Sequence, residues 1–188
     1  MPGLDEYLAM RLLSAGGEPT FALLELATGA EVPDRDLHDP RVRAMTELAM
    51  MLASLDNDRH SLRKELARGH SDQNIYTVLM AERGLPFQQA AEEANRLRDR
   101  LMLRFLELHD RLRPTAGADL TTYLQGLRHG VRGNNEWGLR VPRYLSIGHW
   151  PDEMEGTSLS WADGPSDTRR GPVEGAPGIA WWWDTDLG

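Results

Sequence analysis

Cysteine is absent from this 188-residue sequence, and the signatures of several common protein classes are absent with it. Without cysteine, disulfide bonds, thiolate metal sites and a cysteine nucleophile are excluded. No run of about 18 apolar residues is present, which a membrane-spanning helix requires. The first six residues show no cationic region followed by an apolar one, so they do not resemble a secretory signal. We therefore expect a protein with no membrane span, located in the cytoplasm.

Lysine is nearly absent, because Lys64 is the only one and the other basic residues are arginines. The 21 basic residues face 29 acidic ones, and the net charge of −8 disfavours a nucleic-acid-binding protein. The six histidines show no His-x-x-x-His or His-Glu-x-x-His spacing, which argues against a zinc site. Neither Gly-x-Ser-x-Gly nor a phosphate-binding P-loop is present.

Alternation typical of β-strands is also missing, whereas apolar residues recur at helical spacing through residues 1–148. The longest predicted helix begins at Asp39-Pro40, an N-cap followed by a first-turn proline, and continues to Gly69. A second long amphipathic helix is predicted over residues 86–112, and shorter helices around residues 4–15, 20–27, 74–82 and 120–131. With 40% hydrophobic residues, the chain can bury a core. The predicted fold class is all-α.

Residues 149–188 have a different composition. They contain four prolines, six glycines and five of the six tryptophans, and they show no periodicity. Eight acidic residues face two arginines there, so most of the net charge belongs to this segment. We predict an irregular, disordered tail. Trp181–Trp183 could instead cap a pocket as an aromatic lid, although a disordered terminus is the preferred interpretation.

One polar stretch on the longest predicted helix is a candidate metal site. Asn57, Ser61 and Glu65 are spaced at i, i+4 and i+8, within about 80° of arc on one helix face. Each offers an oxygen, the ligand type that Mg²⁺ prefers, and substrate phosphate oxygens could complete the site. Lys64 could contact the same anion. The alternative is a solvated helix face, but Asn and Ser inside a helix are unfavourable without such a role. His60 is predicted to lie on the helix surface.

The pattern Asn57-Asp58-x-x-Ser61-x-x-Lys64-Glu65 resembles the NSE metal-binding motif of bacterial class I terpene synthases. Arg143-Tyr144 resembles the C-terminal Arg-Tyr pair of that family, which hydrogen-bonds the substrate diphosphate. Residues 7–11 resemble the segment whose arginine senses pyrophosphate, and Arg11 would take that role. The resemblance covers about residues 4–145. It implies the C-terminal half of the class I terpenoid synthase α-helical bundle, with a partial domain at 1–148 and the tail at 149–188.

The resemblance also implies an activity and a role for each residue. Asn57, Ser61 and Glu65 would bind Mg²⁺, and Lys64 would bind the diphosphate together with the catalytic group Arg11, Arg143 and Tyr144. The implied reaction is the Mg²⁺-dependent ionisation and cyclisation of a linear isoprenyl diphosphate, with farnesyl diphosphate as the expected substrate and pyrophosphate as a product. A homodimer is compatible with it.

The family's aspartate-rich metal motif, which precedes the sensor arginine, has no counterpart in this sequence. Residues 34–39 are acidic, but they follow Arg11 and are predicted to form a loop ending in the cap Asp39. We therefore interpret the chain as the C-terminal half of a terpene synthase: a fragment, a mis-started gene model or a truncated gene. The alternative is a catalytically inactive helical protein, or an interaction module, that lacks the aspartate-rich half.

Overall fold

The computed structural model describes residues 1–69, 73–145 and 162–184, and every regular element in these ranges is a helix. This confirms the all-α prediction. The α-helices are α1 (Leu4–Ser14), α2 (Gly17–Ala22), α3 (Leu24–Thr28), α4 (Asp34–Leu37), α5 (Pro40–Ala67), α6 (Ile75–Arg83), α7 (Phe87–Leu112), α8 (Ala118–Gly138) and α9 (Pro142–Leu145). A 3₁₀ helix, η2 (Pro177–Trp183), follows.

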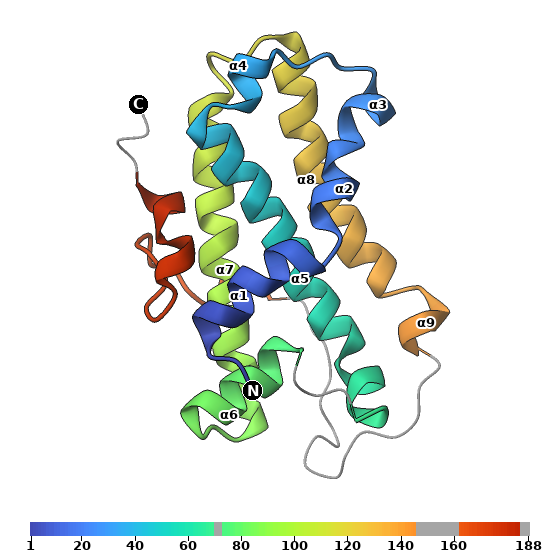
Figure 1. The fold of residues 1–188 in the computed structure, drawn as a ribbon, viewed down its shortest axis with the longest axis vertical. Coiled ribbons are helices and arrows are strands. Elements are labelled where there is room, and N and C mark those ends of the chain that lie inside the picture. The colour runs from blue at the N-terminus through green and yellow to red at the C-terminus, as the bar shows by residue number, and fades with distance from the viewer. Residues whose placement is uncertain (70–72, 146–161, 185–188) are drawn as a thin grey trace.

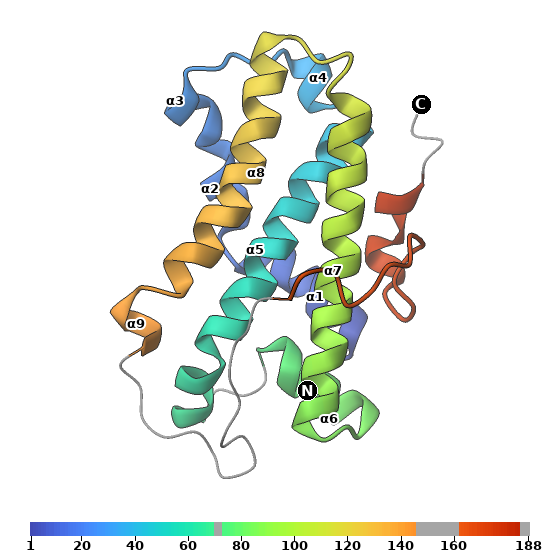
Figure 2. The same cartoon turned by 180° about the vertical axis from the view of Figure 1, so that it is seen from behind.

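Helix α5 is the central element, and α7 and α8 pack along it on either side (Figure 1, Figure 2). Its start follows the predicted signal: the Asp39 side chain accepts a hydrogen bond from the backbone N–H of Arg41 at 2.8 Å, and Pro40 is the first helical residue. Sixteen residues of α5 are buried, including charged and polar ones in its C-terminal half. An amphipathic surface helix usually exposes its polar residues to solvent. The polar residues in this half of α5 are instead buried against neighbouring elements, so this half is a candidate for a functional site.

The short helices α2 and α3 pack against α8 at two of its glycines. Phe21 of α2 lies against Gly130, where an added Cβ would stand 2.6 Å from the phenyl ring. Leu24 of α3 lies against Gly126, where an added Cβ would stand 3.2 Å from the leucine side chain. The missing side chains on α8 therefore allow α2 and α3 to pack closely on it. Residues 34–37, predicted as loop, form the single turn α4.

Helix α1 crosses α5, and its other side contacts η2 (Figure 1). The structure differs here from the predicted disorder, because residues 162–184 are placed and packed. Trp182 has 0% exposure, and its indole N–H donates to Glu47 at 2.9 Å. Buried side chains rather than sequence periodicity order this segment, which is why the composition did not indicate it. The boundary placed at residue 148 lies outside the described residues.

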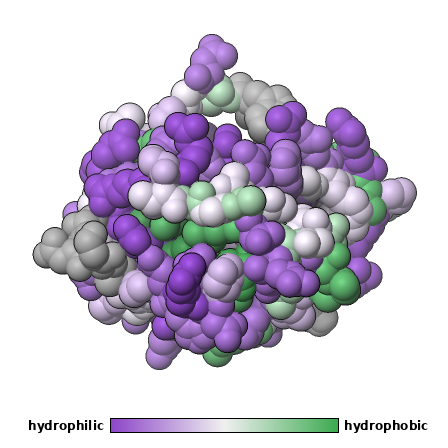
Figure 3. Space-filling view, turned by 90° about the horizontal axis from the view of Figure 1, so that it is seen from above, coloured by the Kyte–Doolittle hydropathy of each residue, from purple (hydrophilic) through white to green (hydrophobic). Residues whose placement is uncertain are grey.

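The surface is mostly hydrophilic, with a few apolar areas. Figure 3 shows the end of the molecule that is uppermost in Figure 1, where apolar side chains occupy the centre and hydrophilic ones surround them. Large apolar side chains are also exposed on α1, the α2–α3 link, α3, α8 and α9, namely Leu13, Leu23, Leu26, Trp137 and Leu145. Within the described residues, no helix is long and apolar enough to cross a membrane.

Candidate functional site

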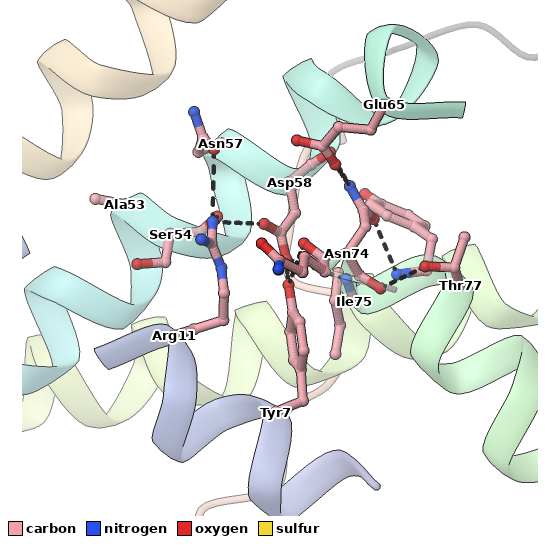
Figure 4. Close-up of polar contacts among 12 residues, drawn as sticks. Tyr7, Arg11, Ala53, Ser54, Asn57, Asp58, Glu65, Asn74, Ile75 and Thr77 are labelled. Atoms are coloured by element: carbon pink, nitrogen blue, oxygen red, sulfur yellow. Dashed lines mark hydrogen bonds and ion pairs between the residues drawn. The ribbon is translucent and has the colours of Figure 1, made fainter. Parts of the chain in front are cut away.

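The polar half of α5 meets α1, the start of α6 and α9 in one connected cluster. Figure 4 shows the part of it around Asp58, with residues from α1, α5 and the start of α6. Asp58 lies at its centre with a side chain 1% exposed. Its Oδ1 accepts a hydrogen bond from Arg11 Nη2 at 2.7 Å, and its Oδ2 accepts from the Tyr7 hydroxyl and, at 3.1 Å, from the backbone N–H of Ile75. One carboxylate therefore joins three helices.

The ionisation of this cluster is governed by its burial. Burial raises the pKa of Asp58 to about 6, although the Arg11 charge and the hydrogen bond from Tyr7 both favour the carboxylate. Burial and the neighbouring Asp58 carboxylate raise the pKa of the Tyr7 hydroxyl far above its ordinary value. Tyr7 therefore remains a neutral donor at every physiological pH.

Arg11 is anchored to α5 by more than this ion pair. Its Nη2 also donates to the backbone carbonyl of Ser54 at 3.3 Å and lies 3.5 Å from Asn57 Oδ1. The Nε of Arg11 is buried and has no hydrogen-bond partner among the described residues. The guanidinium is thus fixed beside Asn57 with a donor left for a further group.

Asn57 and Tyr144, two residues predicted for the site, are in direct contact although they lie 87 positions apart in the sequence. Asn57 Nδ2 donates to the Tyr144 hydroxyl oxygen at 2.8 Å. Two predicted cations flank the same tyrosine: Lys64 Nζ lies 5.2 Å and the Arg143 guanidinium carbon 5.8 Å from the centre of its ring. Burial and the Arg143 charge lower the pKa of Lys64.

Glu65 is held by a residue that the sequence interpretation did not include. Asn74 Nδ2 donates to Glu65 Oε2 at 2.9 Å and to the backbone carbonyl of Asp58 at 2.8 Å, while its Oδ1 accepts from the backbone N–H of Tyr76 at 3.2 Å. Asn74 is therefore both the N-cap of α6 and the clamp that orients Glu65 (Figure 4).

Ser61 completes the predicted metal triad, and its buried hydroxyl is the clearest indication that a ligand binds beside this residue. It is 1% exposed, and its Oγ has no hydrogen-bond partner among the described residues. A buried hydroxyl without a partner is costly, and a metal ion or substrate oxygen would satisfy it. Within the described ranges no group of three or more His, Asp or Glu side chains is arranged to hold a metal. A metal held by these residues would therefore use amide and hydroxyl oxygens together with Glu65.

His60 lies in a different place from the one predicted. It is 8% exposed rather than on the helix surface, and its Nε2 lies 3.2 Å from Asn135 Oδ1. Burial and the Arg59 charge lower the pKa of His60, so its ring is neutral at pH 7. The prediction failed because residues 135–138 of α8 cover this face of α5, which helical spacing within α5 cannot show.

The structure therefore brings the predicted residues to one region. Arg11, Asn57 and Tyr144 form a continuous chain of contacts, and Lys64 and Arg143 lie around the ring of Tyr144. Glu65 joins through Asn74, whereas the Ser61 hydroxyl makes no hydrogen bond to any residue that the structure describes. Four residues of this region were given no role by the sequence: Tyr7, Asp58, Asn74 and His60. For Tyr7 a signal was available, because it lies one helical turn before Arg11.

Comparison with known proteins places this site in a family. Residues 1–104 match the family described as "Terpene synthase family 2, C-terminal metal binding". The chain belongs to that family. The matched region includes Asn57, Ser61 and Glu65 but ends before Arg143 and Tyr144, and its description confirms the expectation of a metal-binding domain.

Similar terpene synthases extend along nearly the whole chain. Spiroviolene synthase from Streptomyces violens is 67% identical over 100% of this chain and 52% of its own length. Phomopsene synthase from Allokutzneria albata is 38% identical over 97% and 50%. The crystal structure of the SVS_A2 protein, obtained by ancestral sequence reconstruction, superposes with a TM-score of 0.84 at 64% identity over 100% of this chain and 50% of that one. The chain thus spans about half the length of the relatives it matches.

Proposed function

We propose that this chain is the diphosphate-binding and metal-binding part of a class I terpene cyclase, which ionises a linear isoprenyl diphosphate with the help of Mg²⁺. The observation that carries the proposal is the contact chain from Arg11 through Asn57 to Tyr144, beside a buried Ser61 hydroxyl with no hydrogen-bond partner in the described part of the chain. These residues offer donors for an anion and oxygens for a cation in one place. The family membership and the named synthases above support the same reaction class.

The chain's own residues would stabilise the leaving group. The breaking C–O bond leaves its electron pair on pyrophosphate, and an allylic carbocation remains. The Arg11, Lys64 and Arg143 cations would bind the developing negative charge, which lowers the barrier where the charge appears. Tyr144 accepts from Asn57 through its oxygen, so its own proton is available to a phosphate oxygen. Asn57, Ser61 and Glu65 would hold Mg²⁺, which when bound supplies further positive charge to the diphosphate.

The substrate length is the finer part of the proposal. Farnesyl diphosphate remains the expected substrate. The names of two more distant relatives differ on this point. A Streptomyces clavuligerus synthase, 30% identical, is named as cyclising farnesyl diphosphate, whereas a Streptomyces protein, 29% identical, is named a diterpene cyclase. Experiments should therefore offer both the C15 and the C20 diphosphate.

The first experiment measures binding. Calorimetric titration of the chain with inorganic pyrophosphate should show binding that requires Mg²⁺. Replacing Arg143 by Ala should weaken it about tenfold or more, because a charge-assisted hydrogen bond is removed. Arg140→Ala is the matched control, since Arg140 is an exposed arginine just before α9 and outside the contact chain. No binding by the unchanged chain would contradict the proposal and favour an inactive helical protein.

The second experiment measures chemistry. The chain is incubated with farnesyl or geranylgeranyl diphosphate and Mg²⁺, and hydrocarbons and released pyrophosphate are quantified together. Cyclic products that disappear on Ser61→Ala substitution support the cyclase. If the chain binds pyrophosphate but forms no product, cyclase activity of this chain is contradicted, and only the proposed diphosphate site is supported. The molar mass of the chain in solution tests whether it forms a homodimer.

A further inference from the structure

The His60 side chain packs tightly against two residues of α8, Gly138 and Asn135. Its ring lies directly on the backbone of Gly138, where an added Cβ would stand 2.1 Å from His60 Cδ2 and 2.5 Å from Nε2. Only glycine leaves room for the ring at this position. Its Nε2 meets Asn135 Oδ1 at 3.2 Å, and Arg59 donates to the same oxygen. The oxygen accepts only, so His60 carries its proton on Nε2.

The His60 ring also contacts Tyr144. The two ring centres are 6.0 Å apart and their planes differ by 24°, so the rings are stacked. The Trp137 ring meets the same tyrosine edge-on, at 5.8 Å and 89°. Aromatic contacts at these separations orient rings in addition to burying them. Tyr144 thus contacts a ring from α5 and a ring from α8.

Holding the Tyr144 ring also fixes Asn57. The Tyr144 hydroxyl oxygen receives the Asn57 amide N–H at 2.8 Å, and that bond decides which end of the amide points away from the tyrosine. With Nδ2 engaged, Oδ1 is on the side where Arg11 lies 3.5 Å away. The side chain can then present an oxygen rather than a nitrogen to a cation. If the Tyr144 ring rotated, its hydroxyl would no longer fix the orientation of the Asn57 amide.

We propose that His60 is a positioning residue for the diphosphate and metal site: packed against both Gly138 and Tyr144, it sets the position of the Tyr144 hydroxyl and through it the orientation of the Asn57 amide. The functional meaning of this device rests on the proposed function, whereas the chain of contacts does not. His60 itself touches neither ligand. A residue that only filled the core would require neither the bare glycine nor the link to Asn57.

Two alanine substitutions on α8 test the proposal without removing any side chain of the site. Gly138→Ala forces the His60 ring to move. Gly133→Ala is the matched control, because an added Cβ there meets no atom within 4 Å. His60→Phe keeps a ring on Tyr144, and Arg59 still satisfies Asn135 in that variant. Folding of each variant is checked by circular dichroism and urea unfolding.

The first readout needs no ligand. In ¹H–¹⁵N spectra, Tyr144→Phe removes the acceptor and moves the Asn57 side-chain amide signals. Gly138→Ala should move the same signals in the same direction, whereas Gly133→Ala and His60→Phe should leave them near their original positions. Unchanged Asn57 signals in Gly138→Ala would overturn the proposal. A His60→Phe spectrum that matches Gly138→Ala would also overturn it, because the hydrogen bond rather than the ring would then be decisive.

The second readout is pyrophosphate affinity in the presence of Mg²⁺. Gly138→Ala should weaken binding about three- to tenfold, the size of one lost hydrogen bond. In the Tyr144→Phe background the same substitution should have no further effect, because His60 acts through that hydroxyl. Additive losses would assign His60 a merely structural role. If the unchanged chain binds no pyrophosphate, the proposed function fails, and the amide spectra still decide the role of His60.

Discussion

At the scale of single residues, the most consequential side chain is one whose role the sequence interpretation did not assign. Asp58 stands inside the motif, and its carboxylate accepts hydrogen bonds from Arg11, Tyr7 and the start of α6. It is fully surrounded by donors, which is why the buried carboxylate is tolerated. Its function is to set the distance between α1 and α5, and hence the place of Arg11.

Replacing Asp58 by Asn should destabilise the protein although the shape is retained. An amide offers one oxygen where the carboxylate offers two, so either Arg11 or Ile75 N–H faces an NH₂ group. We expect a loss of about 1–3 kcal/mol in the free energy of unfolding, measured by urea titration at pH 8. Asp110→Asn is the control, because that carboxylate is largely exposed on α7. Equal stability of Asp58→Asn and the unchanged chain would contradict the role assigned to Asp58.

At the scale of elements, helix caps and apolar periodicity in the sequence predicted the long helices. Asp39-Pro40 marked the start of α5, Gly69 its end, and the apolar stripe marked α7. The segment after residue 161 carries no such signal. Its order comes from contacts with elements far away in sequence, such as Arg104 Nε donating to the Trp182 carbonyl at 2.7 Å. Periodicity within a segment cannot report a contact that another segment supplies.

The anchor of that segment can be tested at Trp182. Removing its indole leaves a cavity between η2 and the helical bundle and removes the partner of Glu47, so Trp182→Ala should cost about 3–5 kcal/mol of unfolding free energy. The neighbouring Trp181 is only partly buried, and Trp181→Ala should cost clearly less. Urea unfolding followed by far-UV circular dichroism measures both. Similar losses for the two variants would show that η2 has no fixed anchor.

At the scale of the whole molecule, the two ends of the described chain meet on α1. Gly178 N–H donates to Asp5 Oδ1 at 2.8 Å, across 173 positions of sequence, while the opposite side of α1 carries Tyr7 and Arg11 into the site. From the sequence, the motif placed Asn57, Ser61, Lys64 and Glu65 on one helix, and the structure has all four on α5. The sequence could not predict the contacts within the site, because Asn57–Tyr144 and Tyr7–Asp58 join elements 87 and 51 positions apart.

The segment after residue 161 crosses α7 (Figure 2) and is bound to it by an ion pair. The Asp167 carboxylate, 4% exposed, accepts from Arg169 and from Arg100, at 2.8 and 2.7 Å. These guanidinium groups hold the pKa of Asp167 well below its ordinary value. Because the folded pKa lies below the unfolded one, the carboxylate stabilises the fold above about pH 4, and this stabilisation is lost as the pH falls toward the folded value.

Asp167→Asn should therefore lower the urea midpoint at pH 7, and its difference from the unchanged chain should shrink as the pH is lowered from 5 toward 3. The reason is that acid protonates Asp167 in the unfolded chain first, which removes the advantage that the ion pairs provide. Asp163→Asn, at an exposed position of the same segment, controls for the change in net charge. A difference in urea midpoint that stays constant with pH would mean that the Asp167 side chain stabilises the segment through packing and not through its charge. A shrinking difference shows that charge fastens the end of the chain to α7.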